Sequence, residues 1–198
     1  MSRVKESSKT EIITRTVVLE GIGDIMFDRY AGDNTTQLEP HQKLYFAADA
    51  KTLILPALNI MSFLSAHNTN SAPKRLMDKR KFKDAANACL SFVTINPTSI
   101  PFLRNGKPIE FGVLDKDVDR TSGVYIHRSV ARLDKGIPNP KVRPVLPLPW
   151  SLKFTLMLMP NKEITEQQIL NLFEAGGLAL GLGTFRGVYG KFAVVQWE

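Results

Sequence analysis

The chain of 198 residues has little of what metal and disulfide chemistry requires. Its single cysteine, Cys89, cannot form an internal disulfide, which also excludes clustered-cysteine zinc and iron–sulfur sites. The three histidines, His41, His67 and His127, lie far apart and show no ligand spacing. Serine nucleophile elbows and HExxH zinc motifs are absent as well. We therefore expect no metal site, no cofactor and no catalytic residue.

Long hydrophobic runs are also missing. No uninterrupted apolar run approaches the roughly 18 residues that a membrane span needs. The first ten residues are polar and charged, with no hydrophobic segment behind them, so we expect no secretory signal. These absences predict a soluble cytoplasmic protein without a membrane partner.

Acidic residues are outnumbered by basic ones. The chain has 26 Lys and Arg against 19 Asp and Glu, a net charge of +7. Its 43% hydrophobic and 23% charged residues are typical of one globular domain of this length. The positive charge favours a polyanionic partner such as nucleic acid, and an inert basic surface is the alternative.

Hydrophobic spacing predicts strands and helices in alternation. The expected strands cover 11–20, 44–47, 123–132, 152–158 and 191–197, and the expected helices cover 56–66, 72–88 and 165–176. Thr165 and Gln168 have capping-box spacing, and Gly176-Gly177 predicts the end of that last helix. Five prolines in 133–149 predict no regular element there, and 96–108 is expected to form loops and short extended pieces.

This order of elements predicts an α+β fold. We expect a ferredoxin-like (RRM-like) four-stranded antiparallel sheet, with two helices on one face and the other face free for a ligand. The chain is then a single domain, 1–198, and the basic helix belongs to an insertion at 67–122.

Two basic clusters support a nucleic-acid partner. The first comprises Lys74, Arg75, Lys79, Arg80, Lys81 and Lys83. On one helix, Arg75, Lys79 and Lys83 would form a stripe of phosphate ligands. The second follows a predicted strand and comprises Arg128, Arg132, Lys135, Lys141 and Arg143. The alternative for both clusters is a solvated basic surface.

A glycine-rich loop at 177–190 joins the last predicted helix to the last predicted strand. A dinucleotide fingerprint needs the reverse order, with glycines opening a helix after a strand, and no Walker lysine is present. Backbone N–H groups, at Gly181 and Gly183 for example, are expected to approach phosphates here. Arg186 and Lys191 would add charge and Tyr189 a stacking face. Alternatively, the glycines merely allow helix and sheet to pack closely.

This loop, ending in Tyr189-Gly190-Lys191-Phe192, resembles the hallmark of the repeat-associated mysterious protein superfamily, the RNA-handling subunits of CRISPR ribonucleoproteins. The segment 53–60 is similar to the start of the first helix in the backbone subunits of that superfamily, although Ala57, Asn59 and Ser62 differ from its usual residues. The resemblance covers about 11–66 and 123–197, and it implies that 67–122 is a thumb-like elaboration.

The resemblance implies a non-enzymatic, largely sequence-independent RNA-binding subunit. Copies would oligomerise along a guide-like single strand, with other ribonucleoprotein subunits and a complementary strand as further partners. One alternative is an RNA-processing endonuclease that uses His127 as acid or base. Another is a viral or mobile-element protein that mimics or inhibits such an assembly. A carboxylate among Asp24, Asp28 and Asp33 could support metal-assisted cleavage, but turn chemistry is the simpler explanation of these residues.

Overall fold

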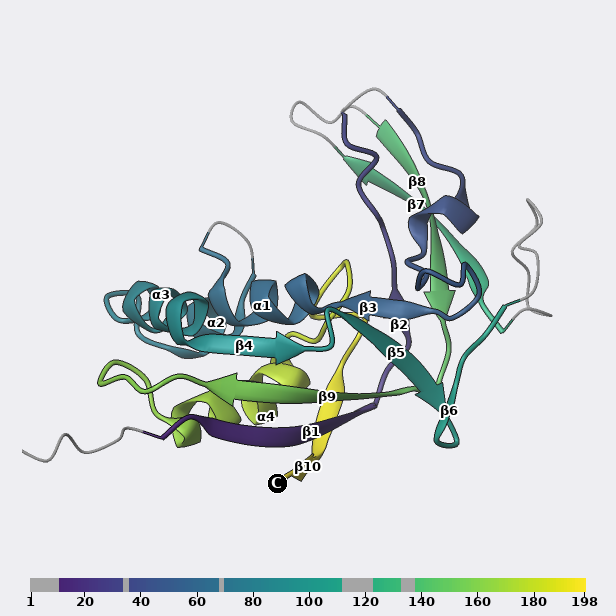
Figure 1. The fold of residues 1–198 in the computed structure, drawn as a ribbon. Helices are drawn as coiled ribbons and strands as arrows, with labels where there is room; N and C mark the ends of the chain where they lie inside the picture. The colour runs from purple at the N-terminus through teal and green to yellow at the C-terminus, as the bar shows by residue number, and fades with distance from the viewer. Residues whose placement is uncertain (1–10, 34–35, 68–69, 112–122, 133–137) are drawn as a thin grey trace, which may run out of the picture.

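The computed structural model describes residues 11–33, 36–67, 70–111, 123–132 and 138–198, which form a mixed α+β fold with two antiparallel sheets (Figure 1). The strands are β1 (Ile13–Gly21), β2 (Ile25–Met26), β3 (Ile54–Pro56), β4 (Val93–Asn96), β5 (Ser99–Arg104), β6 (Lys107–Pro108), β7 (Tyr125–Arg132), β8 (Pro138–Leu146), β9 (Ser151–Leu158) and β10 (Phe192–Trp197). The helices are α1 (Ala57–Ser65), α2 (Ala72–Leu76), α3 (Phe82–Phe92), α4 (Glu166–Ala179) and the 3-10 helix η1 (Pro40–Lys43). The predicted α+β class is confirmed.

The larger sheet has seven strands rather than the four predicted. Its order is β10-β1-β9-β5-β3, with β4 also pairing with β9 and β6 with β5. Three of the expected strands, β1, β9 and β10, lie in this sheet, whereas the expected strand 123–132 is β7 of the smaller sheet. The additional strands are β3 and, from 93–108, β4, β5 and β6; most of 93–108 was expected to form loops and short extended pieces. The predicted strand 44–47 does not form, since Phe46 makes only an isolated bridge with Leu53. The designation of 67–122 as a thumb-like insertion stays a prediction, and 68–69 and 112–122 lie outside the described residues.

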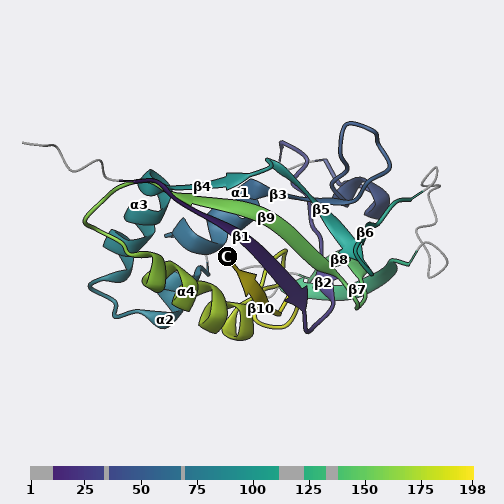
Figure 2. The same cartoon turned by 60° about the horizontal axis from the view of Figure 1, so that its bottom comes forward.

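The core lies between this sheet and the helices, which cover one of its faces (Figure 2). Every second residue of β9, from Leu152 to Leu158, is buried. Phe154 pairs with Val17 of β1 in the antiparallel register. Phe173 of α4 packs against Phe63 of α1, with ring centroids 5.5 Å apart. The alternation that predicted strand 152–158 therefore marks the face that the helices cover.

Helix α4 starts as predicted and ends later than predicted. Thr165 and Gln168 form the expected capping box. The helix continues through Gly176 and Gly177 to Ala179. A Cβ at Gly176 would lie 2.7 Å from the Phe63 ring, so glycine permits close packing here instead of ending the helix. Among the described residues, no helix is long and apolar enough to cross a membrane.

The predicted helix 72–88 is two helices, which corrects the expected stripe of Arg75, Lys79 and Lys83. Helix α2 ends at Leu76 and α3 begins at Phe82. The Asp78 carboxylate accepts a hydrogen bond from the Arg80 N–H at 2.7 Å, which stabilises the turn between them. The three basic residues consequently lie on two helices and a turn, rather than on one helical face.

The smaller sheet has the order β2-β8-β7, and its strand β8 contradicts the expectation that 133–149 holds no regular element. The carbonyl of Val142 accepts from Lys43 Nζ and that of Pro144 accepts from the Phe27 N–H, so both face away from β7. In an antiparallel strand, residues an even number of positions apart direct their backbone nitrogen and carbonyl to the same side. The nitrogens of Pro138, Pro140 and Pro144, which carry no N–H, therefore also face away from β7. The prolines therefore cost the β7–β8 ladder no hydrogen bond.

Candidate nucleic-acid interface

The glycine-rich segment 180–191 forms an ordered loop between α4 and β10, as its sequence predicted. Its glycines adopt left-handed backbone conformations, with φ of 83° at Gly181, 76° at Gly183, 91° at Gly187 and 72° at Gly190. A Cβ at Gly190 would overlap the carbonyl oxygen of Leu182. The loop therefore depends on glycine both for backbone conformation and for close contact.

Most N–H groups of this loop have acceptors within the protein. Gly181 donates to the Gly176 carbonyl at 3.1 Å, and Gly183 donates to Asn59 Oδ1 of α1 at the same distance. Gly190 donates to the Asp24 carbonyl at 2.7 Å. These N–H groups hold the loop against α1, α4 and the β2 segment, so they are not available to a phosphate in this structure. Contact of Gly181 and Gly183 with RNA stays a prediction.

The loop presents an aromatic side chain that the sequence did not single out. Phe185 has a left-handed backbone, with φ of 53°, and its side chain is 56% exposed. Its ring lies 6.1 Å from that of Tyr189, at an interplanar angle of 31°. A non-glycine residue in this conformation is strained, and strain of this kind concentrates at binding sites. The pair forms an aromatic surface on which a base can stack.

Tyr189 connects the loop to the β7–β8 hairpin. Its hydroxyl lies 3.4 Å from His127 Nδ1, and the two ring centroids are 5.8 Å apart. Two residues earlier on the same face of β7, the Tyr125 hydroxyl donates to Asp24 at 2.9 Å. Burial, together with this contact to a carboxylate, raises the pKa of Tyr125, so its hydroxyl stays protonated at neutral pH. These contacts fix the loop against one face of the hairpin.

The same face of the hairpin carries two predicted RNA ligands. Arg143 lies opposite His127 in the register, and Lys141 lies opposite Ser129. Arg143 forms an ion pair with Asp28 at 2.6 Å and is mostly covered, so its charge is largely compensated. Lys141 forms no ion pair with any described residue. We call Phe185, Tyr189, His127 and Lys141 the loop–hairpin surface.

Arg128 lies on the opposite face of the hairpin and is exposed. Together with Lys141 it lines a cavity of about 1120 Å³ between the hairpin and residues of 28–33 and 36–43. For Arg132 the structure describes the backbone position at the end of β7 and not the side chain, and Lys135 lies outside the described residues. Two of the predicted hairpin cations, Lys141 and Arg128, thus line one cavity.

The two basic residues of the loop itself have different surroundings. Arg186 donates to the carbonyls of Gly183 and Asn70, at 3.2 and 3.0 Å. Burial lowers the pKa of its guanidinium, and these bonds give Arg186 a role in anchoring the loop. Lys191 is half-buried, and within the described part of the chain it has no ion-pair partner. Of the two, Lys191 retains the uncompensated charge.

The basic segment 74–83 lies apart from the hairpin. Its cationic side chains are exposed, and no described residue forms an ion pair with them. In Figures 1 and 2, α2 and α3 lie at one end of the molecule and the β7–β8 hairpin at the other, with the loop 180–191 between them. The two predicted basic clusters therefore do not meet in one groove.

Each acidic residue considered for cleavage already has partners. The Asp24 carboxylate accepts from Tyr125 and from the Leu148 N–H, and Asp28 binds Arg143 and Lys43. Asp33 accepts from the Thr36 N–H and hydroxyl, as in the Asx turn that loop chemistry predicted. Across the described ranges, no cluster of His, Cys, Asp or Glu could hold a metal ion.

Sequence reasoning selected Tyr189 and His127 but missed Phe185 and Tyr125. An aromatic residue within a run of glycines was the available signal for Phe185, whereas the Tyr125–Asp24 contact joins residues 101 positions apart. No known protein family and no curated protein matches this sequence. The interpretation of this surface therefore rests on its geometry and charge.

Proposed function

We propose that this protein is a non-enzymatic RNA-binding subunit that holds a guide-like single strand and oligomerises along it. Within the larger sheet, the strand order β10-β1-β9-β4 supports a ferredoxin-like unit. Along the chain, α1 lies between β1 and β4 while α4 lies between β9 and β10, as such a unit requires. The glycine-rich loop lies between α4 and β10, the last helix and last strand, which supports the resemblance to CRISPR backbone subunits.

The observation that carries the proposal is the exposed Phe185 ring, beside Tyr189, on a loop that is tied to a polar hairpin. Aromatic side chains stack on bases regardless of sequence, which suits a protein that must accept many guides. Lys141 and Lys191 would contact phosphates, and Arg143 would stay paired with Asp28. Phosphate contacts position the strand and leave base edges free for pairing with a complementary strand.

The test is the salt-dependent affinity of the full chain for an unstructured single-stranded RNA, measured by fluorescence anisotropy. Base–aromatic stacking is worth about 1–3 kcal/mol, so Phe185→Ala should weaken binding about tenfold. The matched control is Leu90→Ala on α3, where the apolar side chain is 64% exposed but distant in the chain from the loop. Equal affinities of Phe185→Ala and Leu90→Ala would refute the role of the loop.

Phosphate contact is tested separately by the salt slope. Each phosphate neutralised on a single strand contributes about −0.7 to the slope of log K against log salt. The double variant Lys141→Ala/Lys191→Ala should therefore make the slope shallower by about 1.4. Lys107→Ala, at an exposed lysine of β6, should leave the slope unchanged. No binding of RNA by the unaltered chain would reject the proposal and favour a protein that binds an assembled ribonucleoprotein instead.

The contact of His127 with Tyr189 favours one second candidate, an RNA-processing endonuclease. The imidazole lies on the hairpin face that the loop approaches, where it could move a proton at a bound ribose hydroxyl. Incubation with a hairpin RNA distinguishes the two functions. Cleavage that is lost in His127→Ala would establish the enzyme, whereas binding without cleavage by the unaltered chain supports the RNA-holding subunit.

A further inference from the structure

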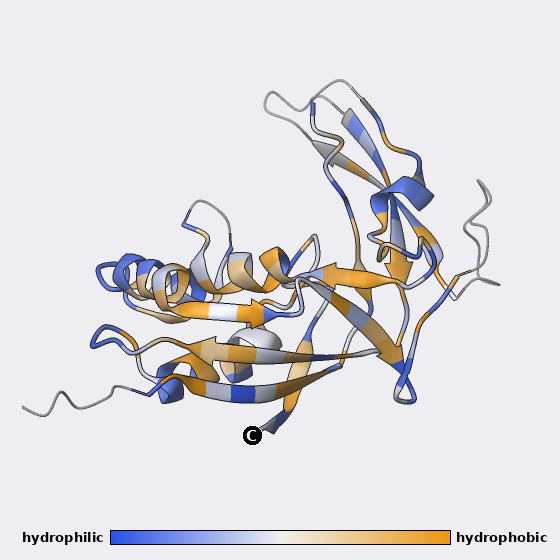
Figure 3. Ribbon diagram, viewed as in Figure 1, coloured by the Kyte–Doolittle hydropathy of each residue, from blue (hydrophilic) through white to orange (hydrophobic). Residues whose placement is uncertain are grey.

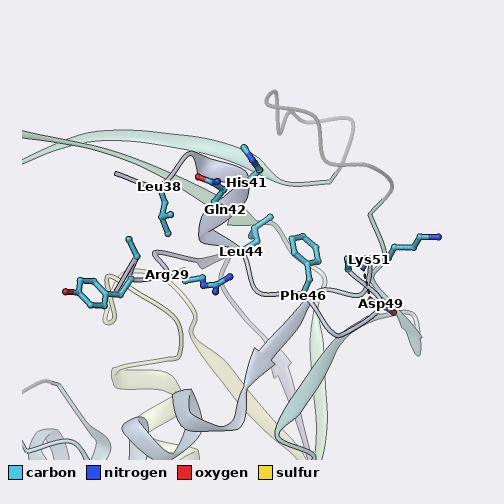
Figure 4. A pocket seen from close by; sticks show the side chains of 11 residues that line it. Arg29, Leu38, His41, Gln42, Leu44, Phe46, Asp49 and Lys51 are labelled. Atoms are coloured by element: carbon cyan, nitrogen blue, oxygen red, sulfur yellow. Dashed lines mark hydrogen bonds between the residues drawn. The ribbon is translucent and has the colours of Figure 1, made fainter. Parts of the chain in front are cut away.

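A second concave site lies in the segment that runs beside the smaller sheet. It is a cavity of about 690 Å³ formed by residues 29–31 and 38–51. Figure 4 shows Leu38, Leu44 and Phe46 in a row, with Arg29 on one side of the row and Asp49 and Lys51 at its far end. Its volume is within the roughly 300–1,000 Å³ of small-molecule sites.

The apolar wall of this cavity is a preformed surface for a flat ring. Leu44 is fully buried, and Phe46 is held from behind by Phe111, with ring centroids 6.1 Å apart and an interplanar angle of 88°. Leu38 extends the wall on the other side of Leu44 (Figure 4). Such a wall suits a planar heterocycle better than a fully hydrated ion.

Two cations line the cavity without ion-pair partners in the described part of the chain. The Arg29 guanidinium lies 5.8 Å from the centroid of the Tyr45 ring, which orients it without neutralising it. The Asp49 carboxylate is already used, because it accepts from the Thr52 hydroxyl and from the N–H groups of Thr52 and Lys51. These bonds lower the pKa of Asp49 to about 2. Arg29, which lies beside the apolar row, is therefore the cation placed to bind an anionic group, whereas Lys51 extends from the far end of the row beside Asp49 (Figure 4).

One polar atom at the cavity lacks a partner. His41, on η1, lines the cavity, and its Nδ1 atom is shielded from solvent with no hydrogen-bond partner in the described residues. A shielded nitrogen without a hydrogen bond costs free energy, which is recovered if the His41 ring turns this atom toward the cavity and a ligand there bonds to it. A ligand with a polar ring edge would satisfy His41.

We infer that this cavity binds a nucleotide, with the base against Leu38 and Phe46, the base edge bonded to His41, and the phosphate on Arg29. The nucleotide is either free or part of a strand. The adjacent cavity lined by Arg128 and Lys141 also includes Arg29 and Leu38, so a strand bound there could extend into this site. The site shares no residue with the loop–hairpin surface and does not depend on RNA binding there.

The presence of only three histidines makes imidazole NMR a direct readout. The untagged chain is titrated with AMP, with adenosine, and with an unstructured single-stranded RNA, and His41→Asn assigns the His41 resonances. We expect AMP to shift the His41 imidazole resonances until they reach a plateau, while the resonances of His67 stay unchanged. Adenosine, which lacks the phosphate, should bind about tenfold more weakly because it loses a charge-assisted contact. If only the RNA shifts His41, the bound nucleotide belongs to a strand.

The variant Arg29→Gln removes an exposed cation and keeps the backbone hydrogen bond from residue 29 to the Lys43 carbonyl. It should weaken AMP or RNA binding, followed by the His41 shift, about tenfold. Lys107→Gln is the matched control. The inference is overturned if neither AMP nor the RNA shifts the His41 resonances. It is also overturned if Arg29→Gln and Lys107→Gln bind the probe with the same affinity. Its failure is distinguishable from failure of the proposed function, because Phe185→Ala should reduce RNA affinity while the AMP titration of His41 stays unchanged.

Discussion

The two sheets of this protein are stabilised by different kinds of contact. The seven-stranded sheet is held by apolar packing, with buried residues alternating along β9 and an aromatic cluster beneath it. In the three-stranded sheet, apolar burial is confined to β2 and the end of β8 among the described side chains. None of residues 125–130 of β7 is buried, and the β7–β8 hairpin makes polar contacts such as Tyr125–Asp24 and Arg143–Asp28. In Figure 3, apolar colour is strong along β3 and β4, and blue polar residues are frequent along the β7–β8 hairpin.

This contrast separates stability from recognition. Apolar burial is the larger source of folding free energy, so the large sheet supplies most of the stability. The small sheet leaves polar side chains accessible, which a binding surface requires. The loop 180–191 joins the two, since Gly190 and Thr184 donate to carbonyls of Asp24 and Met26 beside β2. The following changes test this division, from the largest expected effect to the smallest.

Phe173→Ala should have the largest effect on stability. The ring is fully buried and lies within 6.4 Å, centroid to centroid, of the rings of Phe63, Phe154, Phe192 and Trp197. Truncation of such a residue costs about 3–5 kcal/mol in the free energy of unfolding, measured by urea denaturation. Val130→Ala in the small sheet, at a side chain that is 62% exposed, should change it by less than about 0.5 kcal/mol. Similar losses would show that the small sheet also carries the core.

Gly190→Ala should have the next largest effect, because it strains the junction of the two sheets. The backbone there has φ of 72°, and a Cβ would overlap the Leu182 carbonyl. We expect a loss of more than about 2 kcal/mol and loss of amide-exchange protection in 180–191. Gly187→Ala is the matched control, with φ of 91° but no atom within 4 Å of its Cβ, and it should cost only about 1 kcal/mol. Equal losses for the two variants would mean that the left-handed backbone conformation, and not the close contact with Leu182, is why the loop needs glycine.

Elements with strong local signals could be predicted from the sequence. The alternation in 152–158 and the capping box at Thr165 depend on residues close together in the chain, and both were confirmed. The path of β8 could not be predicted, because the effect of a proline depends on which side of the strand pairs with a neighbour. The continuation of α4 through Gly176 likewise depends on Phe63, more than a hundred residues earlier.

The candidate site was only partly predictable for the same reason. Glycine and aromatic composition indicated the loop and Tyr189, but the occupied N–H groups of Gly181 and Gly183 follow from contacts with α4 and α1. The expected basic stripe failed because the turn at Asp78 separates two helices. Composition thus located charged and glycine-rich segments, whereas tertiary contacts decided which of their groups stay available to a ligand.

Tyr125→Phe should produce a smaller loss, of about 1 kcal/mol, because one partly buried hydrogen bond to Asp24 disappears. The raised pKa of Tyr125 also makes the free energy of unfolding fall at alkaline pH. The folded state holds the phenolic proton more tightly than the unfolded state, so this contribution is complete below about pH 10 and decreases above it. Urea unfolding across that range should show a shallower alkaline decline for Tyr125→Phe. An identical decline in both proteins would assign it to other groups.

Glu166→Gln should have the smallest effect and the opposite pH dependence, in the large sheet. The Glu166 carboxylate accepts from Arg15 at 2.6 Å and from Trp197 at 2.8 Å, and the hydrogen bond from Arg15 is the main cause of its lowered pKa. Because the folded-state pKa is lowered, the Glu166 carboxylate stabilises the fold at pH values above the ordinary glutamate pKa. This stabilisation is lost as the pH falls through the folded-state pKa. The unaltered chain should therefore lose more stability than Glu166→Gln on acidification, and the two should converge at low pH. Because the pair is partly exposed, this difference should be smaller than that of Tyr125→Phe. A larger acid loss in the variant would mean that the ion pair does not stabilise the attachment of α4 to β1.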